Sequence, residues 1–414
     1  MSTNFKKECN VMPLTGIRVL DLSRLLPGGQ CTLMLADMGA DVIKIEEPLR
    51  GDYIRLAAPF DEHGVSPLHL CYNRNKRSLA LDLKNENGIS TFIKLVKDTD
   101  VLVDSFRPGV MERLGIGYQK LKKENPALVH CSITGYGQDG PLARTPGHDL
   151  NFQALGGVVE LTGAAGGPPY VPGVLIGDVG AGIWAAFAIL AALRLADRTG
   201  VGQFIDMSML DAVMSFLSIH GQTYLSTGQC PGREEMRHNG RRPCYRLYPT
   251  KDGRMLSVAC SEPKFWINLC KLIGLDDFYD DYSASGKRRM DVIQTLNNTF
   301  RTKTLDEWIT FFDGADVCVS PALNMRESFG HTQVQSSGLV REYQHPVNGT
   351  YPGTRPAPKF SDLSIRDSLP PPRLGEHSVE ILKEYGFQDK EIKDLMASGA
   401  SHQGADPIGE TISE

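Results

Sequence analysis

The stretch IRVLDLSRLLPGGQCTLMLADMGADVIKI, residues 17–45, decides the fold class of this chain. Residues 17–22 form a short apolar run typical of a strand, and residues 31–38 have apolar positions at helical spacing. Residues 41–45 return to strand character. A strand, a crossover helix and a second strand in this order predict a β-α-β unit with parallel strands.

The same alternation of strand and helix signals continues through the first half of the chain. Because helices regularly separate the strands, the sequence predicts an α/β fold with a doubly wound, Rossmann-like sheet that is mostly parallel and covered on both faces. The predicted elements are strand 79–83, helix 88–97, strand 101–104, strand 127–133, helix 179–197 and strand 203–207.

A change in the order of strand and helix signals after about residue 227 predicts a second, smaller α+β domain. Strands 246–250 and 255–260 flank Lys251-Asp252-Gly253, which is a hairpin turn signal, and helical patterns follow at 264–273 and 290–300. We therefore expect a large domain over residues 13–225, a small domain over 226–330, and a linker over 331–414 whose closing helices, 378–385 and 389–396, return to the large domain.

Composition limits the classes of function. The chain has 414 residues, 41% hydrophobic and 22% charged, which is typical of a soluble globular protein with two domains. A net charge of -5 and a pI near 6.1 give no electrostatic reason to expect nucleic acid or a membrane as a partner. The longest apolar stretch, residues 181–193, is too short to cross a bilayer and is predicted to be a buried helix.

Cysteine spacing and the amino terminus predict the cellular setting. The nine cysteines contain no C-x-x-C pair and no cluster with histidines at metal-ligand spacing, so no metal site is expected. Residues 1–13 lack the apolar core of a signal peptide. Both observations favour a cytoplasmic protein with unpaired thiols.

A literal G-x-G-x-x-G, GYGQDG at residues 135–140, does not predict a dinucleotide site here. A Rossmann fingerprint must open a helix whose amino terminus faces the pyrophosphate. Pro141 follows at once, and the residues after it are typical of a loop. We therefore expect no nicotinamide or flavin dinucleotide.

His148 and Asp178, thirty positions apart, are the candidate catalytic residues of the sequence. An imidazole and a carboxylate at one site can act as two proton-transfer groups, or the carboxylate alone can act as a nucleophile. Each residue also has a structural interpretation. Asp178 could cap the alanine-rich helix that follows it, and His148 could be a buried, hydrogen-bonded histidine.

Six segments together resemble the family III coenzyme A transferases and their relatives, the α-methylacyl-CoA racemases. They are LDLSRLLPG (20–28), ADMGADVIKIE (36–46), NRNKRS (73–78), FRPG (106–109), GHD (147–149) and GEH (375–377). The resemblance implies an enzyme that acts on acyl-CoA thioesters, with CoA as part of the substrate and no other cofactor. It also implies an interlocked dimer, of two identical or two different chains.

The resemblance further implies which residues contact CoA. They are Arg74, Leu81, Asp82, Leu83, Lys84, Ser105, Phe106, Arg107, Arg113, Tyr136 and Asp149. The basic side chains Arg74, Lys76, Arg77, Arg107 and Arg113 could bind the CoA phosphates, or could be solvated surface charges. Glu47 departs from the family, whose members often carry an arginine there that meets the adenine nucleotide. Arg50 or Arg55 could replace it.

The same resemblance assigns roles to the catalytic candidates. Asp178 matches an aspartate that transferases use as a nucleophile, through a mixed anhydride and an enzyme-CoA thioester, and that racemases use as an acid/base group. His148 matches the second acid/base group of the racemases. Glu262 matches their supporting carboxylate from the small domain, or is a first-turn acid beside Pro263 that favours the helix dipole.

The favoured interpretation is a racemase or epimerase of 2-methylacyl-CoA thioesters that exchanges the α-proton between His148 and Asp178. The enolate oxygen is expected to meet backbone N–H groups at the start of the helix that begins near Val179. Arg241 and Arg242 stand where typical racemases have Gly-Gly and could bind a free carboxylate, which favours the alternative of CoA transfer to a carboxylic acid. A third interpretation is a noncatalytic CoA-binding subunit.

Overall fold

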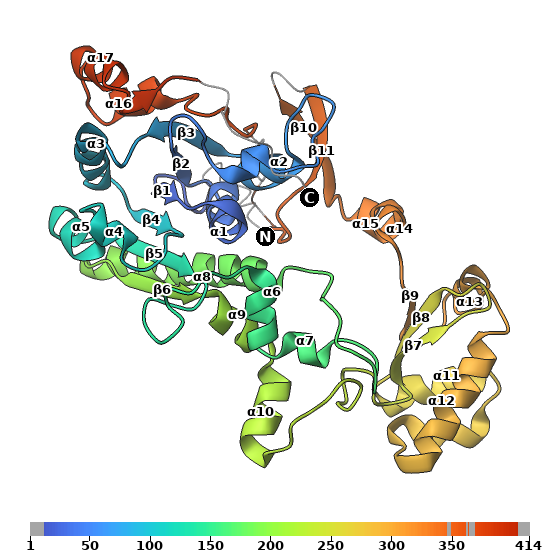
Figure 1. The fold of residues 1–414 in the computed structure, drawn as a ribbon. Helices are drawn as coiled ribbons and strands as arrows, with labels where there is room; N and C mark the ends of the chain where they lie inside the picture. The colour runs from blue at the N-terminus through green and yellow to red at the C-terminus, as the bar shows by residue number, and fades with distance from the viewer. Residues whose placement is uncertain (1–11, 346–348, 362, 364–368, 405–414) are drawn as a thin grey trace, which may run out of the picture. The chain divides into compact units, whose positions relative to one another are not determined.

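The computed structural model describes residues 12–345, 349–361, 363 and 369–404 and divides into two compact units (Figure 1). Unit 1 comprises Met1–Gly156, Val174–Phe216 and Gly338–Glu414, and unit 2 comprises Gly157–Gly173 and Leu217–Ser337. The small unit thus begins before the predicted boundary at residue 226 and gains Gly157–Gly173. Arg233 explains this gain, because its guanidinium bonds the Glu160 carboxylate at 2.5 Å and the Gly167 carbonyl at 2.9 Å.

Unit 1 is built on one seven-stranded sheet in the order β12-β3-β2-β1-β4-β5-β6. Its six long strands run parallel, and the short β12 runs antiparallel to β3. The predicted α/β fold with a mostly parallel sheet is confirmed. The strands are β1 (Arg18–Leu22), β2 (Asp41–Glu46), β3 (Lys76–Leu81), β4 (Val101–Asp104), β5 (Val129–Thr134), β6 (Phe204–Ser208) and β12 (Ser401–His402).

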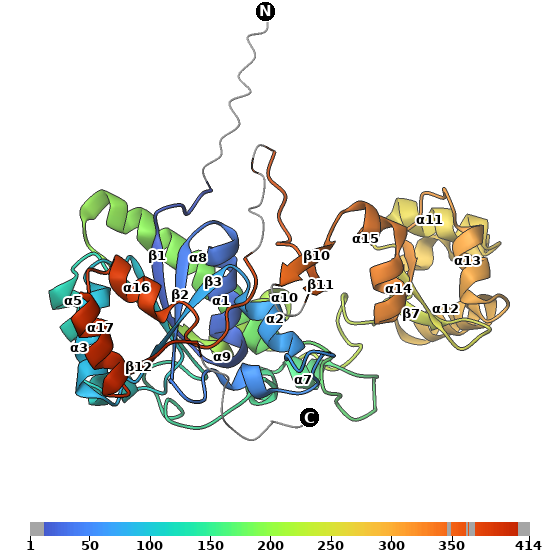
Figure 2. The same ribbon diagram turned by 90° about the horizontal axis from the view of Figure 1, so that it is seen from above.

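Helices cover both faces of this sheet (Figure 2). Successive strand residues point to opposite faces, so Val19 packs under one helix layer and Leu20 under the other. One layer contains α1 (Leu25–Asp37), α8 (Ile176–Thr199) and α9 (Met209–Phe216), and the other contains α3 (Glu86–Val96), α4 (Val110–Arg113), α5 (Tyr118–Glu124), α16 (Ser378–Glu384) and α17 (Asp389–Ala397).

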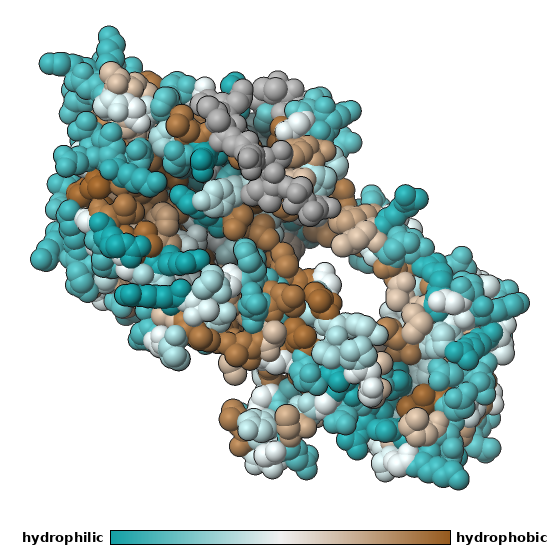
Figure 3. All heavy atoms as spheres, viewed as in Figure 1, coloured by the Kyte–Doolittle hydropathy of each residue, from teal (hydrophilic) through white to brown (hydrophobic). Residues whose placement is uncertain are grey.

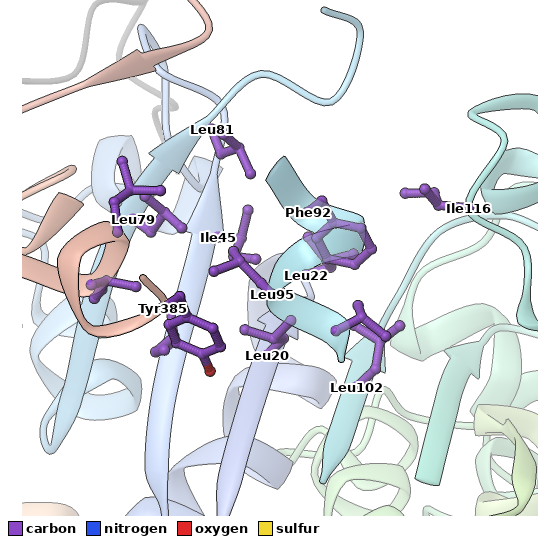
Figure 4. Packing of buried hydrophobic residues seen from close by; sticks show 14 of the residues in the cluster. Leu20, Leu22, Ile45, Leu79, Leu81, Phe92, Leu95, Leu102, Ile116 and Tyr385 are labelled. Carbon is purple, nitrogen blue, oxygen red and sulfur yellow. The ribbon is translucent and has the colours of Figure 1, made fainter. Parts of the chain in front are cut away.

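The closing helices return to unit 1, as the sequence predicts. Ile381 and Leu382 of α16 join Phe92 and Leu95 of α3 in one buried cluster, and Tyr385 lies in the same cluster beside the strand residues (Figure 4). The sequence does not predict β12. It also misses the hairpin of β10 (Val340–His345) and β11 (Gly349–Thr354), which lies within the predicted linker. Linker residues 346–348, 362 and 364–368 lie outside the described residues.

Helix α8 is longer than the apolar stretch from which it is predicted. Within the described part of the chain it is the one helix long and apolar enough to cross a membrane by length and composition. A buried core helix meets the same criteria. Ala181, Ala185 and Ile189 are fully buried against the sheet side of unit 1, which is the environment of a core helix.

Unit 2 contains a three-stranded antiparallel sheet and several short helices. The predicted hairpin at Lys251-Asp252-Gly253 forms between β7 (Tyr245–Pro249) and β8 (Met255–Ala259), and β9 (Val319–Pro321) pairs with β8. Tyr248, Trp266 and Trp308 are buried in its core. The helices are α7 (Val158–Leu161), α10 (Ser218–Thr227), α11 (Pro263–Leu272), α12 (Gly286–Phe300), α13 (Leu305–Phe311), α14 (Met325–Gly330) and α15 (Thr332–Ser336).

Candidate functional site

A pocket of about 170 Å³ lies at the carboxyl ends of β1, β2, β3 and β4. The strand order reverses between β1 and β4, and ligands of open parallel sheets bind outside the carboxyl ends of the strands at such a point. Five of the predicted CoA contacts, Leu81, Asp82, Leu83, Lys84 and Phe106, line this pocket.

Arg24 supplies a second cation of this pocket beside Lys84, and the sequence did not predict it as a CoA contact. Its guanidinium lies 5.2 Å from the Tyr53 ring centre and 5.7 Å from that of Phe106, and it donates to the Tyr53 hydroxyl at 3.1 Å. The Arg24 backbone N–H donates to Ser105 Oγ at 2.9 Å. The carboxylates of Glu46, Glu47, Asp52 and Asp82 also line the pocket.

The suggested replacement of the missing arginine by Arg55 is wrong. Arg55 is buried and pairs with both carboxylate oxygens of Glu46, at 2.8 and 2.7 Å, and it donates to the Pro372 carbonyl at 3.0 Å. Arg50 is exposed, and its backbone N–H donates to Glu47 Oε2 at 2.7 Å.

Three of the basic residues predicted to bind phosphate hold the fold instead. Arg74 is buried and pairs with Asp37 at 2.5 Å, and Lys76 is buried and pairs with Asp21 at 3.1 Å. Arg77 bonds Asp41, Glu380 and Glu384 and so joins β3 to β2 and α16. The prediction that these three cations bind CoA is corrected, because each one neutralises a carboxylate of unit 1.

Arg107 and Arg113 have a different environment. Both are exposed, and within the described part of the chain no carboxylate lies within 4.0 Å of either guanidinium. They follow β4, whose end borders the pocket. These two side chains therefore keep the capacity for charge-assisted bonds to phosphate.

Asp149 joins the two segments that carry the catalytic candidates. It is the first residue of α6 (Asp149–Leu155), and its Oδ1 accepts the backbone N–H groups of Gly177 at 2.8 Å and Asp178 at 3.1 Å. The buried Asp149 carboxylate thus caps α8 from another helix. The turn that contains His148 is thereby held against the start of α8.

This contact corrects two details of the predicted site. Helix α8 begins at Ile176, so Asp178 lies in its first turn and is neither its capping residue nor outside it. The N–H groups of Gly177 and Asp178 are occupied by Asp149, and that of Val179 donates to the Leu175 carbonyl at 3.0 Å. The start of α8 therefore does not offer the predicted donors for an enolate oxygen.

The environment of Asp178 opposes its ionisation. Burial, together with the nearby negative charge of Asp149, raises the pKa of Asp178 to about 7. Tyr72 of α2 (Pro67–Asn73) is a neighbour that the sequence did not reveal. Burial and the charges of Cys71 and Asp178 raise the Tyr72 pKa to about 12, so its hydroxyl keeps its proton at neutral pH.

The packing of α8 on α1 brings Asp178 toward the loop after β1. Gly182 lies one turn after Asp178 on the same helix face. A Cβ at Gly182 would lie 2.7 Å from the Pro27 carbonyl oxygen and 2.7 Å from Gln30 Cβ of α1. This close approach requires glycine and places the face that carries Asp178 beside the beginning of α1.

The other catalytic candidate, His148, precedes α6 and is exposed. Its backbone N–H donates to Asn151 Oδ1 at 3.0 Å, which fixes the turn. A Cβ at Gly147 would lie 2.9 Å from the Tyr136 hydroxyl oxygen and 2.8 Å from Phe152 Cε1. Tyr136, a predicted CoA contact, therefore lies directly against the turn that carries His148.

A buried polar network connects the loops of these two regions. Asp104 Oδ2 lies 2.8 Å from His130 Nε2, while Asp104 Oδ1 accepts Ser132 Oγ at 3.2 Å and the Phe106 N–H at 2.9 Å. Gln138 Nε2 donates to Ser132 Oγ at 2.9 Å. Loop 105–107 and loop 135–140 are thus held to the same pair of strands.

In unit 2, Glu262 immediately precedes α11 and is exposed. It is the N-cap residue and not a first-turn acid, and its side chain makes no cap hydrogen bond. Arg241 Nη1 donates to the Glu235 carbonyl at 3.0 Å, and the Arg242 guanidinium lies 6.0 Å from the Tyr282 ring centre. No group of three or more His, Cys, Asp or Glu among the described residues could hold a metal ion.

Comparisons with known proteins find relatives over nearly the whole chain. The model of CoA-transferase family III matches residues 14–378. Human succinyl-CoA:glutarate CoA-transferase is 34% identical over 400 residues, covering 95% of this chain and 91% of that protein. Human alpha-methylacyl-CoA racemase is 37% identical over 396 residues, covering 93% of this chain and 96% of that protein. The crystal structure of a CaiB/BaiF family protein from Brucella suis is similar to this chain, with a TM-score of 0.79 and 30% sequence identity. The match covers 91% of this chain and 100% of that chain.

Proposed function

Because the chain belongs to CoA-transferase family III, we propose that it binds an acyl-CoA thioester and inverts the configuration at the α-carbon of a 2-methylacyl group. The proposal names His148 and Asp178 as the two groups that exchange the α-proton. Both residues lie in unit 1, at helix starts that Asp149 joins.

The Asp149 contact that joins the turn of His148 to the helix start at Asp178 carries this proposal, and the raised pKa of Asp178 supports it. A general acid/base works best when its pKa lies near the working pH, because both protonation states are then populated. Burial and the Asp149 charge raise the Asp178 pKa to about 7. A carboxylate that acted only as a nucleophile would gain from full ionisation at neutral pH, which this environment opposes.

The proposed reaction needs one proton-transfer group on each side of the α-carbon, one to accept a proton and the other to donate one. One group removes the α-proton, the electron pair of the C–H bond becomes part of the planar enolate, and the other group donates a proton to the opposite face. His148 and Asp178 take these two parts in either direction. Tyr72 keeps its hydroxyl proton at neutral pH, and the charge of Asp178 contributes to its raised pKa.

The pocket at the carboxyl ends of β1–β4 is proposed to hold the nucleotide end of CoA. The Arg24 guanidinium, flanked by Tyr53 and Phe106, supplies a cation and two aromatic faces. Arg107 and Arg113 supply exposed guanidinium groups beside it. The Asp104 network would keep the loop of Ser105–Arg107 in place while CoA binds.

The experiment that tests the proposal is α-proton exchange in deuterated water. The wild-type chain should introduce deuterium at the α-carbon of a chiral 2-methylacyl-CoA and destroy its optical purity. His148→Ala should slow racemisation by about 10²–10⁴-fold, the contribution expected of a positioned acid/base group. His63→Ala, which removes an exposed histidine of unit 1, is the matched control and should leave the rate unchanged. Absence of exchange in the wild type would contradict the proposal.

CoA transfer between an acyl-CoA and a carboxylic acid is the second candidate. The relative named succinyl-CoA:glutarate CoA-transferase and the arginines at positions 241 and 242 support it. In that reaction the Asp178 carboxylate attacks the thioester carbonyl, forms a mixed anhydride and releases the CoA thiolate. Hydroxylamine added with acyl-CoA would then modify Asp178, whereas a racemase leaves it unmodified.

We further propose that two identical chains form the interlocked dimer typical of the family. Hydrophobic residues gather on the surface over α6 and α9 (Figure 3), where Leu150, Leu155, Met214 and Phe216 are exposed. A second copy would remove such side chains from water. Light scattering should give about twice the 45.5 kDa mass of one chain, and a mass of one chain at micromolar concentration would contradict this assembly. The cytoplasmic location stays a prediction from the sequence.

A further inference from the structure

Gln153 lies between the two segments that carry the candidate catalytic residues, and neither the proton exchange nor the nucleotide pocket uses it. It belongs to α6, one turn after Asp149, and its side chain is buried, with 1% exposed. Side chains four positions apart lie on the same face of a helix, so Gln153 and Asp149 are neighbours on α6. Both residues and the start of α8 belong to unit 1.

The Gln153 side chain donates two hydrogen bonds that join α6 to the start of α8. Its Nε2 donates to Asp149 Oδ2 and to the Val174 carbonyl at 3.0 Å. Val174 precedes α8, which begins at Ile176. Because a side-chain amide has two N–H donors, one is used on α6 and the other on the segment that leads into α8.

The two partners of Nε2 fix the orientation of the Gln153 amide. Both are acceptors, so a flipped amide would place Gln153 Oε1 against a carboxylate and a carbonyl oxygen. In the observed orientation Oε1 is buried and has no hydrogen-bond partner among the described residues. A buried acceptor without a partner costs free energy. The structure tolerates this cost and keeps both donors on Asp149 and Val174.

The Asp149 carboxylate is therefore bonded through both of its oxygens. Oδ2 accepts from Gln153, and Oδ1 accepts the N–H groups of Gly177 at 2.8 Å and Asp178 at 3.1 Å. A Cβ at Gly177 would lie 3.0 Å from Asp149 Oδ1, so glycine leaves room for this approach. Three N–H donors stabilise the carboxylate as an anion and hold its charge beside Asp178.

We propose that Gln153 is a positioning residue, which holds the Asp149 carboxylate against the first turn of α8 and so fixes the place of Asp178. The inference rests on the proposed function, in which Asp178 exchanges the α-proton. Gln153 acts through Asp149 and Val174 and not on the reacting atoms. Because proton transfer requires the acid/base group within hydrogen-bond reach of the α-proton, a loosened α8 start would lower turnover more than substrate binding.

Gln153→Met removes both donors and keeps the length of the side chain. It should lower kcat for a chiral 2-methylacyl-CoA about tenfold and leave KM within about twofold. The acid limb of the pH profile of kcat/KM should move down by about half a pH unit, because the Asp149 charge is no longer held beside Asp178. Tyr72 keeps its proton over this range and contributes no limb. A wild-type kcat with an unmoved limb would overturn the proposal.

Two controls separate positioning from a loss of stability. Ile189→Val removes one methylene from the buried side of α8 and touches no bond of Asp149, so stability should fall while the limb stays in place. In an Asp149→Asn background, Gln153→Met should not move the limb further, because the charge through which it acts is absent. An equal movement in Ile189→Val, or an additive movement in the double variant, would contradict the positioning role. Gln153→Leu, which also lacks both donors, replaces Gln153→Met if that variant does not fold.

Unfolding in urea tests the same contact without any catalysis. The pH dependence of the stability difference between Asp178 and Asp178→Asn chains yields the pKa of Asp178. That pKa should be about half a unit lower in the Gln153→Met background than in the wild type, and unchanged in the Ile189→Val background. An unchanged pKa in the Gln153→Met background would overturn the positioning role. A lowered pKa in a chain whose wild type exchanges no α-proton would contradict the proposed function and leave the contact between Gln153 and Asp149 standing.

Discussion

Replacement of Asp178 by asparagine should stabilise the fold, and the gain should depend on pH. Burial and the Asp149 charge raise the pKa of Asp178 to about 7, from an ordinary value of 3.8. The folded chain therefore holds this proton over a range of pH in which the unfolded chain has lost it. Asparagine has a similar shape and never ionises, so the variant avoids the cost of a buried charge.

The sign and size follow from linkage. Below about pH 4 both states are protonated, and the aspartic acid has no electrostatic cost. As the pH rises toward 7, the unfolded state ionises while the folded state does not, so stability is lost until the folded carboxyl also ionises. A difference of about 3 pKa units corresponds to about 4 kcal/mol at most. Because Asp178 is partly exposed, solvent screening should reduce this to about 2 kcal/mol.

The assay is the free energy of unfolding in urea, measured from pH 4 to pH 8 for the wild type and Asp178→Asn. The difference between the two should be near zero at pH 4 and about 2 kcal/mol in favour of the variant at pH 8. Asp98→Asn, at an exposed aspartate of the same unit, is the control and should show no such trend. A variant that is no more stable than the wild type at pH 8 would refute the assigned environment of Asp178.

Three further changes test other parts of the structure. Asp149→Asn keeps the acceptor for the α8 N–H groups but removes the negative charge near Asp178, so the pKa of Asp178 should fall. The acid limb of the pH profile of kcat/KM should then move down by about one pH unit. An unmoved limb would exclude Asp149 as a cause of the raised Asp178 pKa. Arg24→Ala should raise the KM for acyl-CoA about tenfold with little change in kcat, and an unchanged KM would remove CoA from that pocket. Gly182→Ala should lower the free energy of unfolding by about 1–3 kcal/mol in urea, whereas Gly173→Ala, where a Cβ meets nothing within 4 Å, should have little effect.

The parallel sheet could be predicted because local patterns determine it. Strands buried on both faces are continuous apolar runs, and the runs at Val19 and Val42 each precede or follow a helical pattern. The closing helices could also be predicted from a local pattern, because their apolar residues recur at helical spacing. The hairpin at Val340–His345 and Gly349–Thr354 was not, because its proline and glycine residues are typical of loops as well as of edge strands.

The candidate site could be predicted only in part, because side chains distant in sequence decide the rest. The basic residues Arg74 and Lys76 were interpreted as phosphate contacts or as solvated surface charges, yet Asp37 and Asp21 pair with them inside the fold. No spacing rule connects Asp149 to the amides of α8, 28 positions later. The charge of Asp178 also raises the pKa of Tyr72, and no sequence pattern relates these two residues. The sequence identifies residue types that suit the chemistry, and the packing decides which of them are free to take part.

The most direct test of the central claim is the fate of one enantiomer of a chiral 2-methylacyl-CoA in deuterated water without any free carboxylic acid. A racemase needs no acceptor acid, so chiral chromatography should show both enantiomers approaching equal amounts, with deuterium at the α-carbon of the product. Asp178→Asn should abolish this conversion although it stabilises the fold. Retention of configuration and of the α-proton, with turnover appearing only after a carboxylic acid is added, would contradict the racemase account and identify the chain as a CoA-transferase.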